Sequence, residues 1–125
     1  MIRFSTCRGA CLIITSLVLA AISSGEQKRT GSDLFQNRCG GCHSLDQDRV
    51  GPRLRGAFGR AAGAIHKFQY SDALKSSHLV WDAATLDNWL QDPDSVVPDN
   101  DMSFRLQSQA ERTAIIEYLK GLNGH

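Results

Sequence analysis

Cys39-Gly40-Gly41-Cys42-His43 is the stretch of this chain that decides its fold. A pair of cysteines separated by two residues and followed directly by a histidine is the local signature of covalent c-type haem attachment. Each thiol can add across one vinyl group of the porphyrin, and the adjacent imidazole then lies beneath the iron as its proximal ligand. The pentad therefore predicts that Cys39 and Cys42 hold one haem and that His43 is a metal ligand.

Two other interpretations of the cysteine pair make demands on the rest of the chain. A structural zinc site needs a second pair of ligands, but the remaining cysteines, Cys7 and Cys11, lie in a stretch with the pattern of a removable leader. A thioredoxin-like redox pair should follow a buried strand, whereas residues 31–38 are polar and helical in pattern. Neither demand is met, so haem attachment is the favoured interpretation.

The first 25 residues have the shape of a signal peptide. Arg3 and Arg8 precede an apolar run over positions 11–22, and small residues follow it. About a dozen apolar residues are too few for a comfortable membrane span, so we expect cleavage near positions 21–25 and no membrane insertion afterwards. Export suits cysteines that must be handled where disulfide chemistry is managed, and it predicts a periplasmic protein.

The charges of the chain are balanced, with 14 Lys and Arg residues against 13 Asp and Glu residues. This balance provides no basic footprint for nucleic acid. No repeat, low-complexity segment or linker divides residues 26–125, so we predict a single small domain and a monomer. About 100 residues would be only marginally stable on side-chain packing alone, and a buried haem would enlarge their core.

Apolar spacing predicts three helices and no strand. Ser32 is a plausible N-cap for a short helix that leads into the pentad. Residues 82–91 have apolar side chains on one side and end at the pair 92–93, an Asp-Pro step. Residues 108–111 have the form of a capping box for a third helix, which should end within 121–124.

The stretch 45–63 should be a long loop, because it contains several glycines and a proline. Such a loop is unusual in a compact domain unless it packs on something large and flat, and a haem provides that surface. The pattern as a whole predicts an all-α fold in which long loops surround the cofactor.

A second axial ligand is expected, because a protein that only transfers electrons must fill that position to avoid binding oxygen or peroxide. Met102 is the only methionine besides Met1, and it lies among polar residues between the two later helices. These neighbours argue against a role as a gap-filler in a core. His66 and His78 are rivals in polar settings, where a solvated surface histidine is the default. We therefore expect His43 and Met102 to be the metal ligands.

Further elements share one order and spacing: Gly31 and Phe35 before the pentad, residues 51–60 after it, residues 70–73, Trp81, Pro98 with Met102, and residues 118–120. The chain from Gly31 to Gly121 thus resembles the class I cytochromes c, in particular the mitochondrial and bacterial c2 branch. The resemblance implies a class I cytochrome c fold, with a few short helices and long loops wrapped around one covalently bound haem c. It also implies that Gly31 lets the first and last helices cross closely, with Phe35 and Tyr118 at the contact.

The same resemblance implies roles for four residues around the haem. The carbonyl of Pro52 would accept the imidazole N–H of His43 and fix the orientation of the ring. Arg60, Tyr70 and Trp81 would hydrogen-bond the haem propionates, which are anions that need partners when they are buried.

Three positions depart from the family pattern. Trp89 stands where the branch usually has a tyrosine whose hydroxyl reaches the methionine sulfur, so we expect that hydrogen bond to be absent and the potential to be shifted. Asn100 replaces a threonine in the ligand loop, and Leu74 replaces an asparagine near the buried propionate.

The haem edge is expected to be acidic, because mitochondrial relatives have lysines where this chain has Asp92, Asp94, Ser95, Asp99 and Asp101. A partner with an acidic docking face would be repelled by such a surface. The acidic stretch therefore favours a dedicated basic partner.

The sequence as a whole predicts an electron-transfer protein and not an enzyme. The favoured function is an exported one-electron carrier between a periplasmic dehydrogenase or bc1-type reductase and a terminal acceptor, with its redox partners docking at the haem edge. One alternative is a haem subunit or dedicated acceptor of a single dehydrogenase. The other is a peroxidase or gas sensor in which Met102 is labile, and Trp89 is the only feature that points to it.

Overall fold

The computed structural model describes residues 29–124, and the expected leader over residues 1–25 lies outside this range. Within the described residues the chain forms six helical elements: α1 (Gly31–Arg38), α2 (Asp72–Lys75), α3 (Ala83–Gln91), α4 (Pro93–Val96), α5 (Gln109–Gly121) and the 3₁₀ turn η1 (Leu122–Gly124). The only β-pairing in this part of the chain is an isolated bridge between Ala61 and Val80. The predicted all-α class is confirmed.

Helix α1 begins two residues earlier than the sequence predicted. Its N-cap is Thr30 and not Ser32, which lies inside the helix. The Thr30 hydroxyl accepts the Asp33 N–H at 3.1 Å, and the Asp33 carboxylate accepts the Thr30 N–H at 3.2 Å. This reciprocal capping box satisfies two backbone donors, whereas a cap at Ser32 would leave Asp33 without that pairing.

Helices α3 and α5 begin and end as the sequence predicted, with one difference. Asp82 and Thr85 form a complete capping box at the start of α3, and Pro93 opens α4 directly after it. At α5 the Ser108 hydroxyl accepts the Glu111 N–H at 3.3 Å. The Glu111 carboxylate does not complete the box, because it accepts hydrogen bonds from Arg38 of α1 at 3.0 and 3.1 Å.

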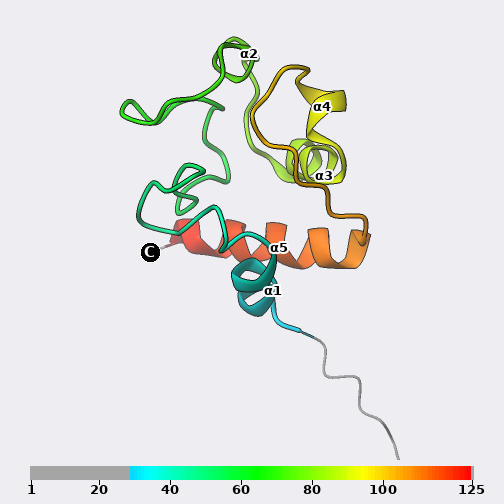
Figure 1. Cartoon of the computed structure of the whole chain (residues 1–125). Helices are drawn as coiled ribbons and strands as arrows, with labels where there is room; N and C mark the ends of the chain where they lie inside the picture. Colours follow the sequence, from blue (N-terminus) through cyan, green and yellow to red (C-terminus); the bar gives the residue numbers. More distant parts are fainter. Residues whose placement is uncertain (1–28, 125) are drawn as a thin grey trace, which may run out of the picture.

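The core forms where α1 crosses α5, and α3 packs beside them (Figure 1). It consists of buried apolar side chains from these helices and the loop before α5: Leu34, Phe35, Leu86, Leu90, Leu106, Ile115, Ile116 and Leu119. A Cβ at Gly31 would lie 2.8 Å from the Cβ of Tyr118, so the close crossing requires glycine. The rings of Phe35 and Tyr118 lie 5.7 Å apart, as the resemblance implied.

A buried charge joins α5 to α3. The side chain of Arg112 is only 6% exposed, and its Nε donates to Oδ1 of Asp87 at 2.8 Å. Its Nη1 donates to the carbonyls of Leu106 and Gln107, each at 2.9 Å. Because these bonds satisfy the guanidinium, Arg112 fixes the chain that leads from the loop into α5.

Residues 45–63 form the predicted long loop, which lies between α5 and α2 (Figure 1). Backbone contacts such as Leu54 N–H to Ser44 carbonyl, 2.9 Å, fold it against the pentad. No helix in the described range 29–124 has the length and apolar character needed to cross a membrane.

Candidate functional site

The pentad folds into one tight turn at the C-terminal end of α1. Cys39 and Gly40 donate their N–H groups to the Phe35 carbonyl, and His43 donates its N–H to the Cys39 carbonyl at 2.8 Å. Cys39 is half-buried and Cys42 is exposed. Burial raises the pKa of the Cys39 thiol to about 11. This apolar setting suits a neutral thioether better than a thiolate.

The imidazole of His43 is oriented by the loop that follows the pentad. Its Nδ1 lies 2.7 Å from the carbonyl oxygen of Pro52, the contact that the resemblance implied. Burial lowers the pKa of His43, and the Pro52 contact only partly opposes this effect. A neutral imidazole that donates from Nδ1 leaves the lone pair of Nε2 free, which is the form that binds a metal.

Gly51 lies against the same ring, a role that was not predicted from the sequence. A Cβ at this position would lie 2.6 Å from Nδ1 and 2.7 Å from Nε2 of His43. The Gly51 N–H also donates to the Cys42 carbonyl at 2.8 Å. The absence of a side chain therefore sets where the imidazole rests, and the only sequence signal was the glycine immediately before Pro52.

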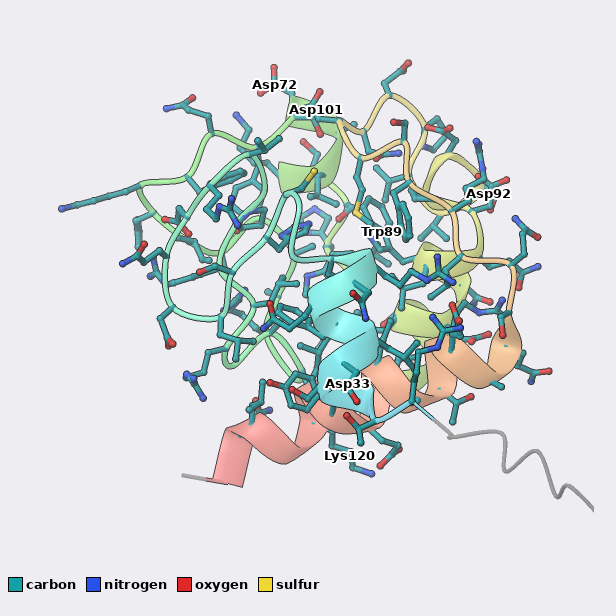
Figure 2. All side chains as sticks on the ribbon, turned by 60° about the horizontal axis from the view of Figure 1, so that its bottom comes forward. Asp33, Asp72, Trp89, Asp92, Asp101 and Lys120 are labelled. Atoms are coloured by element: carbon teal, nitrogen blue, oxygen red, sulfur yellow. The ribbon has the colours of Figure 1, made fainter. Side chains whose placement is uncertain are left out.

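Met102 lies half-buried in the loop between α4 and α5 and packs against the core. The indole Nε1 of Trp89 donates to its Sδ at 3.2 Å. This corrects the expectation that the hydrogen bond to sulfur would be absent, because an indole N–H can replace a phenol hydroxyl as the donor. Trp89 is only 6% exposed and points into the interior (Figure 2).

Two of the three expected propionate partners are joined through their backbones. Trp81 donates its N–H to the Arg60 carbonyl at 3.0 Å. The Trp81 ring then packs edge-on against Trp89, with centroids 5.1 Å apart. These contacts connect the long loop to α3 and so to the donor that faces Met102.

The guanidinium of Arg60 is held by carbonyls of its own loop. It donates to the carbonyls of Arg53 at 3.0 Å and Arg55 at 3.2 Å. Burial raises the pKa of the Tyr70 hydroxyl, and the positive charge of Arg60 acts against that rise. A half-buried guanidinium held in one place is a setting that can receive a carboxylate.

This region offers an imidazole and a thioether as possible donors to iron and two thiols that can bond the vinyl groups of a porphyrin, all on half-buried or exposed side chains. Soft sulfur and imidazole donors of this kind suit an iron porphyrin. Half-buried side chains from the pentad, the long loop and the Met102 loop pack against the core: Cys39, Leu45, Leu54, Phe58, Trp81 and Met102. The residues present therefore fit a haem.

A family model described as cytochrome c matches residues 29–123. The chain belongs to the cytochrome c family. Cytochrome c2 iso-2 of Magnetospirillum molischianum is 45% identical over 87 residues, which span 67% of this chain and 90% of that protein. Cytochrome c of Gibberella zeae is 34% identical over 101 residues, which span 78% and 95%. The solved structure of cytochrome cH from Methylobacterium extorquens matches with a TM-score of 0.69 and 40% identity, covering 73% of this chain and 94% of that one.

As a cytochrome c, the protein carries one covalently attached haem c with iron and is an electron carrier, not an enzyme. The structure places the two histidines that rival Met102 as second axial ligand on the surface. His66 and His78 are both exposed, and His78 occupies a turn with φ of 56°. Leu74 lies half-buried in α2, where its backbone N–H caps on the Ser71 hydroxyl.

The predicted acidic edge keeps most of its negative charge, because a single arginine pairs with two of its four aspartates. Arg105 donates from Nε to Asp92 and from Nη2 to Asp94, each at 2.8 Å. Asp99 and Asp101 remain exposed, and Asp101 projects from the surface (Figure 2). The pairing of Arg105 was not predicted from the sequence, since the ion pairs join positions 11 and 13 residues apart across a loop.

Proposed function

We propose that this cytochrome is an exported, soluble one-electron carrier in which His43 and Met102 ligate the haem iron. Cys39 and Cys42 would hold the porphyrin as thioethers. The observation that carries the proposal is that each axial donor is oriented by its own hydrogen bond: His43 by the Pro52 carbonyl and Met102 by the Trp89 indole.

The bound haem supplies a single electron at a time, and the protein supplies a coordination shell that does not change with oxidation state. The Pro52 contact holds the imidazole of His43 in one plane and in one tautomer. The thioether sulfur of Met102 has two lone pairs, of which the indole N–H engages one, leaving the other for the metal. A hydrogen bond on sulfur also reduces its electron donation, which favours the reduced state and raises the potential.

Arg60, Tyr70 and Trp81 are proposed to receive the haem propionates. Support comes from the Arg60 guanidinium, which is fixed by two loop carbonyls and whose positive charge acts against the rise that burial causes in the pKa of Tyr70. Charge-assisted hydrogen bonds to a propionate would offset the cost of burying that anion.

The partners are proposed to be a dehydrogenase or bc1-type reductase that donates electrons and a terminal acceptor that takes them, both docking at the haem edge. Export to the periplasm is supported by the pattern of residues 1–25. The ion pairs of Arg105 with Asp92 and Asp94 offset one of the four aspartate charges, so the edge stays acidic and partners with a basic docking face are favoured. The bond from Trp89 to Met102 likewise opposes a labile ligand and a peroxidase function.

An optical spectrum of the purified holoprotein tests the ligation. We expect the α-band of c-type haem in the reduced form and a weak sulfur-to-iron charge-transfer band in the ferric form. Met102→Leu should abolish the second band, whereas the control His66→Ala should leave both unchanged. A high-spin ferric spectrum in the parent protein would overturn the proposed ligation.

A further inference from the structure

The side chain of Asn100 folds back into the loop that presents Met102. Its Oδ1 accepts the backbone N–H of Met102 at 2.7 Å. Its Nδ2 donates to the Val97 carbonyl at 2.8 Å and to Oδ1 of Asp94 at 3.1 Å. Both amide donors and one acceptor position of Asn100 are therefore used to shape the turn before Met102.

Arg105 approaches the same carboxylate from the other side of Met102. Its Nη2 donates to Oδ2 of Asp94 at 2.8 Å, while its Nε donates to Asp92. Asp94 thus takes Asn100 on one oxygen and Arg105 on the other. We call Asn100, Asp94 and Arg105 the loop clamp, because it ties both flanks of Met102 to α4.

The clamp acts between a firm anchor and a loop that lacks regular structure. Pro93 of α4 is fully buried, and Val97 directly after the helix is 6% exposed. In contrast, no helix or strand is assigned between residues 97 and 108. Asp99 has a φ of 63°, a left-handed conformation that costs a non-glycine residue free energy. Side chains, and not a backbone ladder, therefore hold the methionine in place.

We propose that the loop clamp is a positioning device that keeps Met102 on the iron and so closes the site to other ligands. This inference rests on the proposed ligation by Met102. Release of the sulfur requires the loop to move away from α4, which strains the bonds from Asn100 and Arg105 to Asp94. In this role the clamp residues are positioning residues and not metal ligands. They act through the backbone of Met102.

The test compares ligand capture by the ferric holoprotein with and without the clamp. Imidazole is mixed with the protein in a stopped-flow instrument at saturating concentration, where the rate is limited by dissociation of Met102. We expect Arg105→Gln to raise this limiting rate about two- to fivefold, as for loss of a half-exposed ion pair. Asn100→Ala removes the acceptor of the Met102 amide and should raise it about tenfold.

Arg55→Gln is the matched control. Arg55 makes a paired contact with Asp46, at 2.6 and 3.1 Å, on another loop. Its side chain is 45% exposed, compared with 43% for Arg105. The control should bind imidazole at the parental rate and retain the sulfur-to-iron band, because its ion pair does not contact the Met102 loop.

The possible results separate this inference from the proposed function. Faster capture in Arg105→Gln with no change in Arg55→Gln supports the clamp, even if Asn100→Ala fails to load haem. Parental rates in both clamp variants, with the sulfur-to-iron band intact, would overturn the clamp and leave the ligation standing. Equal acceleration in Arg55→Gln would also overturn it, since the effect would then be general destabilisation. A parent protein without the band would overturn the ligation itself.

Discussion

The hydrogen bond from Trp89 to Met102 makes a quantitative prediction about the reduction potential. Trp89→Phe removes the N–H that lies 3.2 Å from Sδ and keeps an aromatic ring against Trp81. Without the donor, the sulfur gives more electron density to the ferric iron, so the oxidised state is stabilised and the potential falls. A neutral hydrogen bond contributes about 0.5–1.5 kcal/mol, and a weak sulfur acceptor belongs at the lower end of that range.

A difference of about 0.5–1 kcal/mol between the oxidation states corresponds to a potential lower by about 20–45 mV, since a one-electron couple changes by about 59 mV for each tenfold factor. Trp89→Tyr is the matched control, because it loses a similar volume but restores a hydroxyl donor. We expect its potential to lie within about 10 mV of the parent.

Spectroelectrochemical titration of the three proteins gives the comparison directly. An unchanged or higher potential in Trp89→Phe would refute the argument that the indole withdraws density from the sulfur. An equal fall in Trp89→Tyr would refute it as well, because loss of ring volume would then be the cause.

Three further predictions concern packing and charge. Gly51→Ala should push the imidazole of His43 away from the Pro52 carbonyl, lower the fraction of low-spin haem and destabilise the fold by about 1–3 kcal/mol in urea unfolding. Gly41→Ala should change neither the spin state nor the stability, because nothing lies near a Cβ at that position. Gly31→Ala should cost a similar amount, since its Cβ would meet the backbone of α5; parental stability would count against the close crossing. Arg38 holds the pKa of Glu111 below its usual value, so this contact stabilises the fold above pH of about 4.3 and is lost as the pH falls through the lowered pKa. Unfolding measured from pH 6 to pH 3 should show the parent losing its advantage over Glu111→Gln, and a constant gap would contradict this.

Residue types and spacing were enough to predict the haem pentad, the candidate ligand Met102 and the helices that flank them. The pentad is local, so no tertiary information is needed to recognise it. The Asp-Pro step at 92–93 likewise ends α3 through a clash that depends only on neighbouring residues. Even here, Thr30 and Ser32 are both good caps, and only the reciprocal bond with Asp33 decides between them.

The features that sequence reasoning missed depend on distances across the fold. The indole of Trp89 reaches the sulfur of Met102 only because α3 and the ligand loop pack together. The pairing of Arg105 with Asp92 and Asp94 likewise depends on a loop that folds back onto α4. In each case the residue types allow the contact, but only the packing of distant segments brings the two side chains together.

Proton NMR of the ferrous holoprotein tests the central claim most directly. A methionine bound at the haem iron places its methyl group against the porphyrin, where the ring current moves its signal far upfield of the normal spectrum. Met102 is the only methionine besides Met1, so the assignment needs only the variant Met102→Leu. We predict an upfield methyl signal that disappears in this variant. A spectrum without that signal, or one that keeps it in Met102→Leu, would contradict an electron carrier closed by His43 and Met102.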